Sequence, residues 1–383
     1  MATTNDQWQD QRMQRWCQTL VECGWKVNWV GVDRKRPVPL KSTESIRYDR
    51  LRVIPLGGPV FYSIFNIRLF LKAMALPADA FLAVDADTLP ALRLASLIRR
   101  KPLWFDAHEW FTETPELLHR PFIRNCWRLI IRIFLRGKIH CFTVGHELAL
   151  RLEQNWGHPF IVLRNMPSDK SLDHDGADTE FNKPNININP IIPGLEGPYL
   201  LYQGALNIGR GLESLIEAAA LGLPYPLVIA GSGDLQSPLM ERIHRYNLSN
   251  KVLLLGAQEP EQLRIITSHA FLGFNLLETQ SLNYYYSLAN KFFDYVQAGV
   301  PQVCINFPEY RYYMELYRVG SLIENTEPSV IAQCCHHIVN HKETYKNMQD
   351  NCRQAAGLWN WKQESSILQN NLRQLRSTLP KNV

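Results

Sequence analysis

The chain has 383 residues, and its 41 Lys and Arg against 36 Asp and Glu give a formal net charge of +5. A hydrophobic content of 46% with 11% aromatic residues excludes a wholly disordered chain. No apolar run approaches the roughly 18 residues that cross a bilayer, and the polar residues 1–16 do not read as a secretory signal. We therefore expect a cytoplasmic protein. Its eight scattered cysteines, without Cys-x-x-Cys spacing, predict buried and reduced thiols.

The charge is unevenly distributed along the chain. Residues 1–167 carry 24 cations and 15 anions, whereas the remainder carries 17 cations and 21 anions. An ordinary domain size of roughly 100–200 residues predicts two domains for this length. Between them, residues 168–197 are rich in Asp, Asn, Pro and Gly, which is typical of a linker or loop.

Short β-rich apolar runs alternate with longer helical patterns in both halves, which predicts an α/β protein with doubly wound parallel sheets. A helix is expected over residues 7–23, so the strand that should open the first sheet is either very short, within residues 1–4, or lies upstream. The other expected strands are residues 27–31, 81–84, 103–106, 140–144 and 160–163, then residues 199–203, 227–230, 252–255, 271–276 and 302–305.

A basic amphipathic helix is expected between positions 120 and 136, where an arginine recurs every four residues. Each such step advances about 40° around a helix, so the arginines cover an arc of about 160° and most apolar residues fall opposite. This pattern is typical of a membrane-surface helix, and the alternative is a core helix with solvated arginines. No aromatic and basic platform indicates nucleic-acid binding. The predicted membrane-facing residues are Arg120, Arg124, Arg128, Arg132 and Arg136.

A glycine-rich turn, Gly-Ala-Leu-Asn-Ile-Gly-Arg-Gly at residues 204–211, follows an expected strand and opens a helix. Helix N-terminal N–H groups can face an anion, and Arg210 adds a positive charge. The turn differs from a P-loop, because Arg210 replaces the lysine and Gly211 replaces the Ser or Thr that holds magnesium. We therefore expect phosphate binding without NTPase activity; the alternative is that the glycines serve packing alone.

A second polar cluster lies on the helix expected before the turn Ala-Gly-Val-Pro at residues 298–301. Asn290, Lys291 and Asp294 share one helical turn, because residues three and four apart lie on one face. Lys291 can neutralise a phosphate, and Asp294 can accept hydrogen bonds from ribose hydroxyls. A weak surface pair between the two charges is the alternative.

Taken in order, these segments resemble glycosyltransferases of family four, which have the GT-B fold. The matching motifs are the turn at 204–211, Gly-Ser-Gly at 231–233, Gly256, and the segment 290–301. Residues 5–12, 85–90 and 105–109 look like the acceptor-side loops of a bacterial subgroup. The resemblance implies two Rossmann-like domains facing a central cleft, with the C-terminal helix crossing back to the first. The expected bounds are 1–167 with about 364–383 for the acceptor domain, 168–197 for the linker, and 198–363 for the donor domain.

The resemblance also implies the site residues. His108, after the strand at 103–106, is expected beside the donor sugar as the catalytic residue. The expected acceptor-side residues are Asp10, Arg12 and Glu109. The expected donor-binding residues are Arg210, Lys291, Asp294, Gly204, Gly231, Ser287, Leu288, Ala289 and Asn290.

The sequence departs from the family at two donor positions. Ala205 stands where many relatives have arginine, and Tyr286 stands where the first Glu of a Glu-x₇-Glu motif is expected. Lys291 is expected to replace the missing diphosphate cation. Asp85-Ala-Asp87 has the spacing of a metal-binding pair, but we interpret it as a structural or acceptor loop because it lies in the acceptor half. No catalytic metal is expected.

The function implied is transfer of a sugar, with retention of configuration, from a nucleoside diphosphate sugar to an acceptor in cell-surface polysaccharide or glycolipid synthesis. The expected partners are the nucleotide sugar, a lipid-linked acceptor and an anionic membrane surface, reached as a peripheral protein on the inner face of the membrane. Two alternatives remain: a nucleotide-sugar epimerase, and a non-catalytic nucleotide-sugar-binding or scaffold protein of the same fold.

Overall fold

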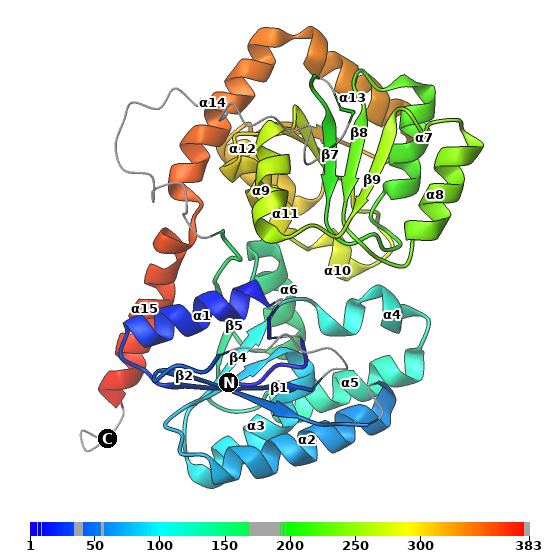
Figure 1. Ribbon diagram of the computed structural model, residues 1–383. Helices are drawn as coiled ribbons and strands as arrows, with labels where there is room; N and C mark the ends of the chain where they lie inside the picture. The colour runs from blue at the N-terminus through cyan, green and yellow to red at the C-terminus, as the bar shows by residue number, and fades with distance from the viewer. Residues whose placement is uncertain are drawn as a thin grey trace. The chain divides into compact units, whose positions relative to one another are not determined.

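The computed structural model of the protein describes residues 1–5, 7–8, 10–33, 41–54, 57–167, 192, 194–195 and 197–378. The chain divides into two compact units (Figure 1). Unit 1 contains residues 1–165 and 361–383, and unit 2 contains residues 166–360. Most of the predicted linker at 168–197 lies outside the described residues.

Unit 1 contains an all-parallel sheet, and a very short strand opens it. Residues 1–3 lie between two neighbours: Ala2 bridges Val30 on one side and Ala83 on the other, and Ala2 N–H donates to Leu82 O at 3.1 Å. Residues 1–3 therefore occupy the place of the strand that was expected to open this sheet. With this segment included, the strand order is β2-β1-(1–3)-β3-β4-β5-β6. The strands are β1 (Val27–Val32), β2 (Ile46–Leu51), β3 (Phe81–Val84), β4 (Leu103–Ala107), β5 (His140–Thr143) and β6 (Phe160–Val162).

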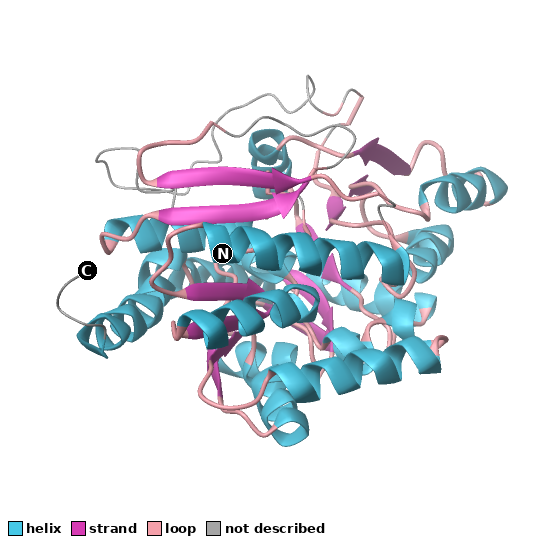
Figure 2. Ribbon diagram, turned by 90° about the horizontal axis from the view of Figure 1, so that it is seen from below, coloured by secondary structure: helices cyan, strands magenta, loops and turns pink. Residues whose placement is uncertain are grey.

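The helices of unit 1 cover this sheet, as the view from below also shows (Figure 2). The first helix begins at Gln11 rather than at residue 7, because the Asp10 carboxylate caps it by accepting from Met13 N–H at 3.0 Å. The helices are α1 (Gln11–Glu22), α2 (Gly58–Ala75), α3 (Asp85–Arg99), the 3-10 turn η1 (Phe111–Glu113), α4 (Pro115–Leu118), α5 (Pro121–Phe134), α6 (His146–Trp156) and α15 (Trp361–Thr378).

The C-terminal helix α15 belongs to unit 1. Leu368 and Leu372 are buried in the same cluster as Trp16 of α1. Trp361 Nε1 donates to Thr19 Oγ1 at 3.0 Å, which fixes the start of the helix against α1. The last segment of the chain therefore completes the core built by the first.

Unit 2 contains a six-stranded parallel sheet in the order β12-β11-β10-β7-β8-β9. Its strands are β7 (Leu200–Gln203), β8 (Leu227–Ala230), β9 (Val252–Gly256), β10 (Leu272–Asn275), β11 (Gln302–Ile305) and β12 (Gly320–Ile323). Its helices are α7 (Leu212–Gly222), α8 (Gln236–Arg245), α9 (Pro260–His269), α10 (Leu282–Tyr285), α11 (Asn290–Gln297), α12 (Pro308–Leu316), α13 (Pro328–Asn340) and α14 (Lys342–Leu358). With β7 counted as the first strand, the order is that of a Rossmann sheet.

The prediction missed two strands, β2 and β12, and both are edge strands. Each pairs with one neighbour, and most of their residues are only half-buried. The other strands of these parallel sheets are mostly apolar runs because helices cover them on both faces. Charged residues in β2 and a glycine and a serine in β12 hide that signal.

Helix α5 differs from its prediction both in its length and in which of its sides is buried. It runs from Pro121 to Phe134, so Arg120 caps it and Arg136 lies beyond its end. Its buried side chains are Trp127 and Ile131, and Ile131 lies only about 60° around the helix from Arg128, outside the face opposite the arginines. The helix must pack on α3 with this side, because α3 is its neighbour in the fold. The apolar side chains on its other side therefore remain exposed.

None of the described helices is both long enough and apolar enough to cross a membrane. All eight cysteines are free thiols, and five of them are buried.

Candidate functional site

The glycine-rich turn lies at the topological switch point of unit 2. Strand β7 has β8 on one side and β10 on the other, so the chain winds away from it in opposite directions. Ligands of doubly wound sheets bind beyond the carboxyl ends of the strands at this point. The turn at 204–211 follows β7 there and leads directly into α7. The turn that the sequence predicted therefore lies where doubly wound sheets bind ligands.

Two glycines allow backbone segments to touch around this turn. A Cβ on Gly231 would lie 1.8 Å from Gly204 O, and a Cβ on Gly211 would lie 2.3 Å from Leu276 O. Gly211 also has a φ of +67°, which side chains disfavour. Tight packing, the alternative left open for these glycines, is thus one of their roles, and it does not exclude anion binding by the same turn.

Two cations converge at this end of the unit 2 sheet, each resting on an aromatic ring. The side chain of Lys291, on α11, is 8% exposed, and its Nζ lies 3.6 Å from the centre of the Tyr202 ring. The Arg210 guanidinium lies 5.3 Å from the centre of the Tyr284 ring. Burial, and then the positive charge of Arg210, hold the pKa of Lys291 well below its usual value. Within the described part of the chain neither cation has a salt-bridge partner, and Arg210 Nε is buried without a hydrogen bond.

Asp294 is held by residues that the sequence analysis did not select. Gln203 Nε2 donates to Asp294 Oδ2 at 3.2 Å, and Thr267 Oγ1 donates to Gln203 Oε1 at 2.6 Å. Tyr202, under Lys291, was also missed. Tyr202 and Gln203 are the last residues of β7, so their place before the glycine turn was the signal that could have found them.

The predicted N–H groups before α11 are largely engaged inside the protein. Ser287 N–H donates to Tyr284 O at 3.2 Å, and Ala289 N–H donates to Tyr310 Oη at 3.2 Å. Leu288 is buried between them, and Asn290 starts the helix. Both amides therefore already have acceptors within the protein, and their contacts with a diphosphate stay a prediction.

In unit 1, His108 belongs to a network of buried charges at the carboxyl ends of the strands. Arg12 donates to both carboxylate oxygens of Asp106, from Nε at 2.9 Å and Nη2 at 2.7 Å, and Asp106 is fully buried. His108 Nε2 lies 2.9 Å from the same Asp106 carboxylate. On the other side of the ring, Nδ1 lies 3.6 Å from Asp85 Oδ2. The imidazole of His108 thus lies between two carboxylates.

The electrostatics of this network favour a charged imidazole. Burial lowers the pKa of His108, but the negative charges of Asp85 and Asp106 outweigh it and raise the pKa to about 9. Burial also acts to raise the pKa of Asp106, yet Arg12 and His108 hold it well below its usual range. Burial, with Asp85 nearby, raises the pKa of Asp87 to about 7. Near neutral pH, His108 is therefore a cation.

The three predicted acceptor-side residues have different places. Arg12 is buried, and its guanidinium donates to Asp106 and, at 2.7 Å, to Leu163 O; its contact with an acceptor stays a prediction. Asp10 caps α1 through one oxygen. Glu109 directly follows His108 and is half-buried.

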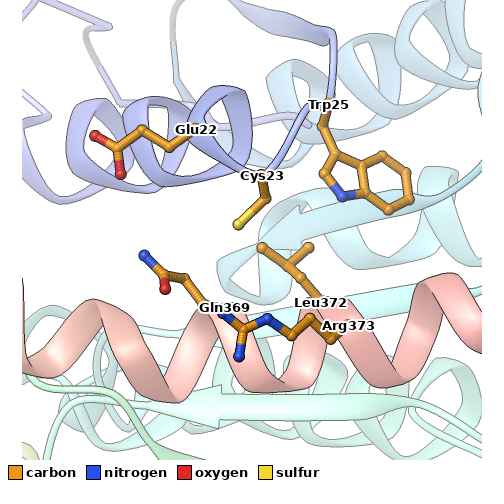
Figure 3. Close-up of a pocket in the computed structure, with 6 residues that line it drawn as sticks. All are labelled: Glu22, Cys23, Trp25, Gln369, Leu372 and Arg373. Carbon is orange, nitrogen blue, oxygen red and sulfur yellow. The ribbon is translucent and has the colours of Figure 1, made fainter.

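A pocket of about 310 Å³ lies elsewhere in unit 1, between the C-terminal end of α1 and α15 (Figure 3). It contains none of the predicted site residues, and the His108 network lies at the opposite end of α1. We assign it no role. Its lining residues are Glu22, Cys23, Trp25, Gln369, Leu372 and Arg373.

Comparison with known protein families shows which family unit 2 resembles. Residues 187–355 match the family model of glycosyl transferases group 1, which is a little under half of the chain. The chain carries a glycosyltransferase domain. This domain contains the glycine-rich turn, the cations Arg210 and Lys291, and Asp294. No curated protein sequence matches the chain significantly.

Solved structures share the fold of this glycosyltransferase along nearly its whole length. Anabaena Alr3699/HepE, solved with UDP, has a TM-score of 0.73 at 14% identity, covering 97% of this chain and 98% of the other. WaaG, a glycosyltransferase involved in lipopolysaccharide biosynthesis, has a TM-score of 0.69 at 13% identity, covering 97% of each chain. A putative UDP-N-acetylglucosamine 2-epimerase from Listeria monocytogenes has a TM-score of 0.62 at 12% identity, covering 99% of this chain and 96% of the other. The fold is GT-B, as the resemblance implied, but fold alone does not separate transferase from epimerase.

Proposed function

We propose that this glycosyltransferase is a retaining enzyme of the family-four type, from the bacterial subgroup, and that it uses a nucleoside diphosphate sugar as donor. The observation that carries the proposal is the pair Arg210 and Lys291 at the switch point of unit 2. Among the described residues these two neighbouring cations form no salt bridge, and the positive charge of Arg210 contributes to the lowered pKa of Lys291. A diphosphate supplies the missing negative charge, and Asp294 lies on the same helix for ribose hydroxyls.

The chemistry assigned to these residues is stabilisation of the leaving group. Cleavage of the glycosyl bond leaves negative charge on the diphosphate and positive charge on the sugar. Preorganised cations stabilise the negative charge of the diphosphate, and they do so most strongly in a site with little water. Arg210 and Lys291 supply that charge from the protein, so the proposal requires no catalytic metal. His108 is the proposed catalytic residue of unit 1.

The two alternative functions, epimerase and scaffold protein, differ from a transferase in that neither needs an acceptor. An epimerase acts on the nucleotide sugar alone, and a scaffold protein binds it without reaction. The match to group 1 glycosyl transferases supports transfer over epimerisation. WaaG acts in lipopolysaccharide biosynthesis, which supports an acceptor in cell-surface polysaccharide or glycolipid synthesis.

A thermal-shift panel tests the donor proposal. The panel contains sugars of UDP, GDP, ADP and dTDP, and we expect one of them to raise the melting temperature because it binds only the folded state. At 100 times its Kd, that ligand adds about 2.7 kcal/mol to the free energy of unfolding. Free glucose serves as the control. If no nucleotide sugar changes the melting temperature at millimolar concentration, the donor proposal is wrong. Release of free epimer from the stabilising sugar, without an acceptor, would favour the epimerase.

We also propose that unit 1 binds the inner face of a membrane, where a lipid-linked acceptor is presented. The predicted basic helix gave the first indication, and the structure supports a wider surface. Arg124 and Arg128 are partly neutralised, because both pair with the buried carboxylate of Glu113. Arg132, however, is exposed on the same side as Phe122, which is 81% exposed.

The proposed membrane face spans three neighbouring helices, since α3 packs against both α2 and α5. Each helix exposes large apolar side chains away from the core, and no Asp or Glu occurs in residues 50–78, 88–105 or 117–146. Exposed apolar groups beside cations suit an anionic lipid surface. The exposed apolar residues are Val60, Ile67 and Leu71 on α2, Leu94, Leu97 and Ile98 on α3, and Phe122, Leu129 and Ile133 on α5.

Vesicle co-sedimentation tests this membrane face. We expect binding to vesicles with 30% phosphatidylglycerol and weak binding to pure phosphatidylcholine. Arg132→Gln should lower the affinity about fivefold, because one cation near an anionic surface contributes about 1 kcal/mol. Phe122→Ser should also weaken binding by removing an inserted ring. Leu221→Ser and Arg245→Gln, at exposed positions of unit 2, are the matched controls. Equal binding by all four variants would contradict the proposal.

A further inference from the structure

The side chain of Gln203 occupies a position in unit 2 where the strand pattern predicts an apolar residue. Alternate residues of a strand share one face, so Tyr199, Leu201 and Gln203 lie on the same face of the sheet. Tyr199 and Leu201 are buried there in a cluster with Ile266 of α9 and Tyr295 of α11. Gln203 ends this row at the carboxyl end of β7 and is 3% exposed. A buried amide at this place needs hydrogen-bond partners, because an unpaired buried polar group destabilises the folded state.

Gln203 has a hydrogen-bond partner on each of two helices. Its Nε2 donates to Asp294 Oδ2 on α11 at 3.2 Å, and its Oε1 accepts from Thr267 Oγ1 on α9 at 2.6 Å. Thr267 is 2% exposed, and α9 and α11 are in contact with each other. A chain of hydrogen bonds therefore runs from the buried threonine through the amide to the carboxylate.

The carboxylate fixes the direction of the hydrogen bonds in this chain. An ionised carboxylate only accepts, so the NH₂ group of Gln203 must face Asp294 and its oxygen must face Thr267. The single hydroxyl proton of Thr267 has a second acceptor within reach, Leu263 O at 2.7 Å. A flipped amide would leave the proton with that second acceptor, but it would bring two oxygens together at Asp294. Asp294 and Thr267 therefore hold the amide in one orientation, and the amide limits the rotation of the carboxylate.

We propose that Gln203 is a positioning residue that holds the Asp294 carboxylate for both ribose hydroxyls, so that the donor is a ribonucleoside diphosphate sugar. That Asp294 meets ribose rests on the proposed function. A carboxylate has about four lone-pair sites, so one bond from Gln203 orients the group and still allows it to accept hydroxyls. A carboxylate that cannot turn toward water stays unpaired when one hydroxyl is missing, and such a site discriminates strongly against the analogue. Sugars of dTDP lack the 2′-hydroxyl and are therefore outside the donor class.

Isothermal titration of the full chain with UDP, GDP and ADP, each compared with its 2′-deoxy form, tests this selection. We expect the diphosphate that binds the wild type to bind about 10- to 100-fold more tightly than its 2′-deoxy form, because it makes one more hydrogen bond to a charged group. In Gln203→Met the two affinities should become similar, because the ribonucleotide alone binds more weakly. Gln297→Met is the matched control on α11. That amide donates to the carbonyl oxygens of Ala356 and Trp359 rather than to a carboxylate, so the wild-type ratio should remain.

A pair of variants at Thr267 separates positioning from packing. Thr267→Val removes the hydroxyl at nearly equal volume and should lower the ratio of the two affinities, whereas Thr267→Ser keeps the hydroxyl and should match the wild type. Should Gln203→Met fail to fold, this pair decides.

The outcomes distinguish this selection from the donor proposal itself. Equal affinity of the wild type for a diphosphate and its 2′-deoxy form would overturn the selection and leave the donor proposal standing. A ratio that is unchanged in both Gln203→Met and Thr267→Val would show that Gln203 does not position Asp294. If no diphosphate binds the wild type, the donor proposal is wrong, and the selection with it.

Discussion

Replacement of Lys291 by methionine is expected to weaken UDP binding by about 10- to 100-fold, because a hydrogen bond to a charged group contributes about 1.5–3 kcal/mol. The same change should leave the empty protein as stable as wild type or more stable. Lys291 is buried beside Arg210 and its pKa is held well below its usual value, so its charged form destabilises the folded state at neutral pH. Methionine removes that cost and keeps much of the side-chain volume. Isothermal titration with UDP, and thermal unfolding without it, measure the two effects.

The pH dependence gives the same argument a second test. A lysine whose pKa is lowered on folding makes the wild type gain stability as pH rises from the lowered value towards 10.5. In Lys291→Met this gain should disappear. Lys251→Met, at an exposed position before β9, is the matched control and should change neither UDP affinity nor the pH profile. Unchanged UDP affinity in Lys291→Met would show that the cation pair is not the donor site.

The sequence predicted the parts of this fold whose signal is local. Central strands such as β8 and β11 are apolar runs buried on both faces, and the glycine turn after β7 is marked by its composition. The edge strand β2 was missed because its exposed, charged residues carry no such run. The strand of residues 1–3 could not be assigned, since three residues show no periodicity and are held by neighbours far along the chain.

The candidate site shows the same division between local and distant information. Lys291 and Asp294 were found because they share a helical turn, whereas Tyr202 and Gln203 act through contacts with residues about ninety positions away. Arg12 was assigned to the acceptor from a motif at the N-terminus. Its salt-bridge partner, Asp106, is 94 residues away on β4, and no spacing within the sequence relates the two. Likewise, a regular series of arginines could not show which side of α5 packs on α3.

Replacement of Arg12 by methionine is expected to destabilise unit 1 by about 3–5 kcal/mol at neutral pH, because it leaves the fully buried Asp106 carboxylate without its bidentate partner. Arg15→Met is the matched control on the same helix: Arg15 pairs with the neutral Asn165, so its loss should cost much less. Urea unfolding of the two variants, followed by tryptophan fluorescence, measures the difference, because nine of the ten tryptophans lie in unit 1. Equal stability of Arg12→Met and wild type would contradict a role for this ion pair in holding the network.

The direction of the pH effect distinguishes the Arg12 network from a simple loss of packing. The folded pKa of Asp106 is lowered, so its stabilisation is present above its unfolded pKa and is lost as pH falls through the folded value. Without Arg12 that folded pKa rises, and acid unfolding should begin at higher pH. His108 acts in the opposite sense: its stabilisation is complete below its unfolded pKa of about 6.5 and is lost as pH rises through about 9. Arg12→Met should keep or strengthen this alkaline limb, because the positive charge that opposes protonation of His108 is gone. A uniform loss of stability at every pH would assign Arg12 to packing alone.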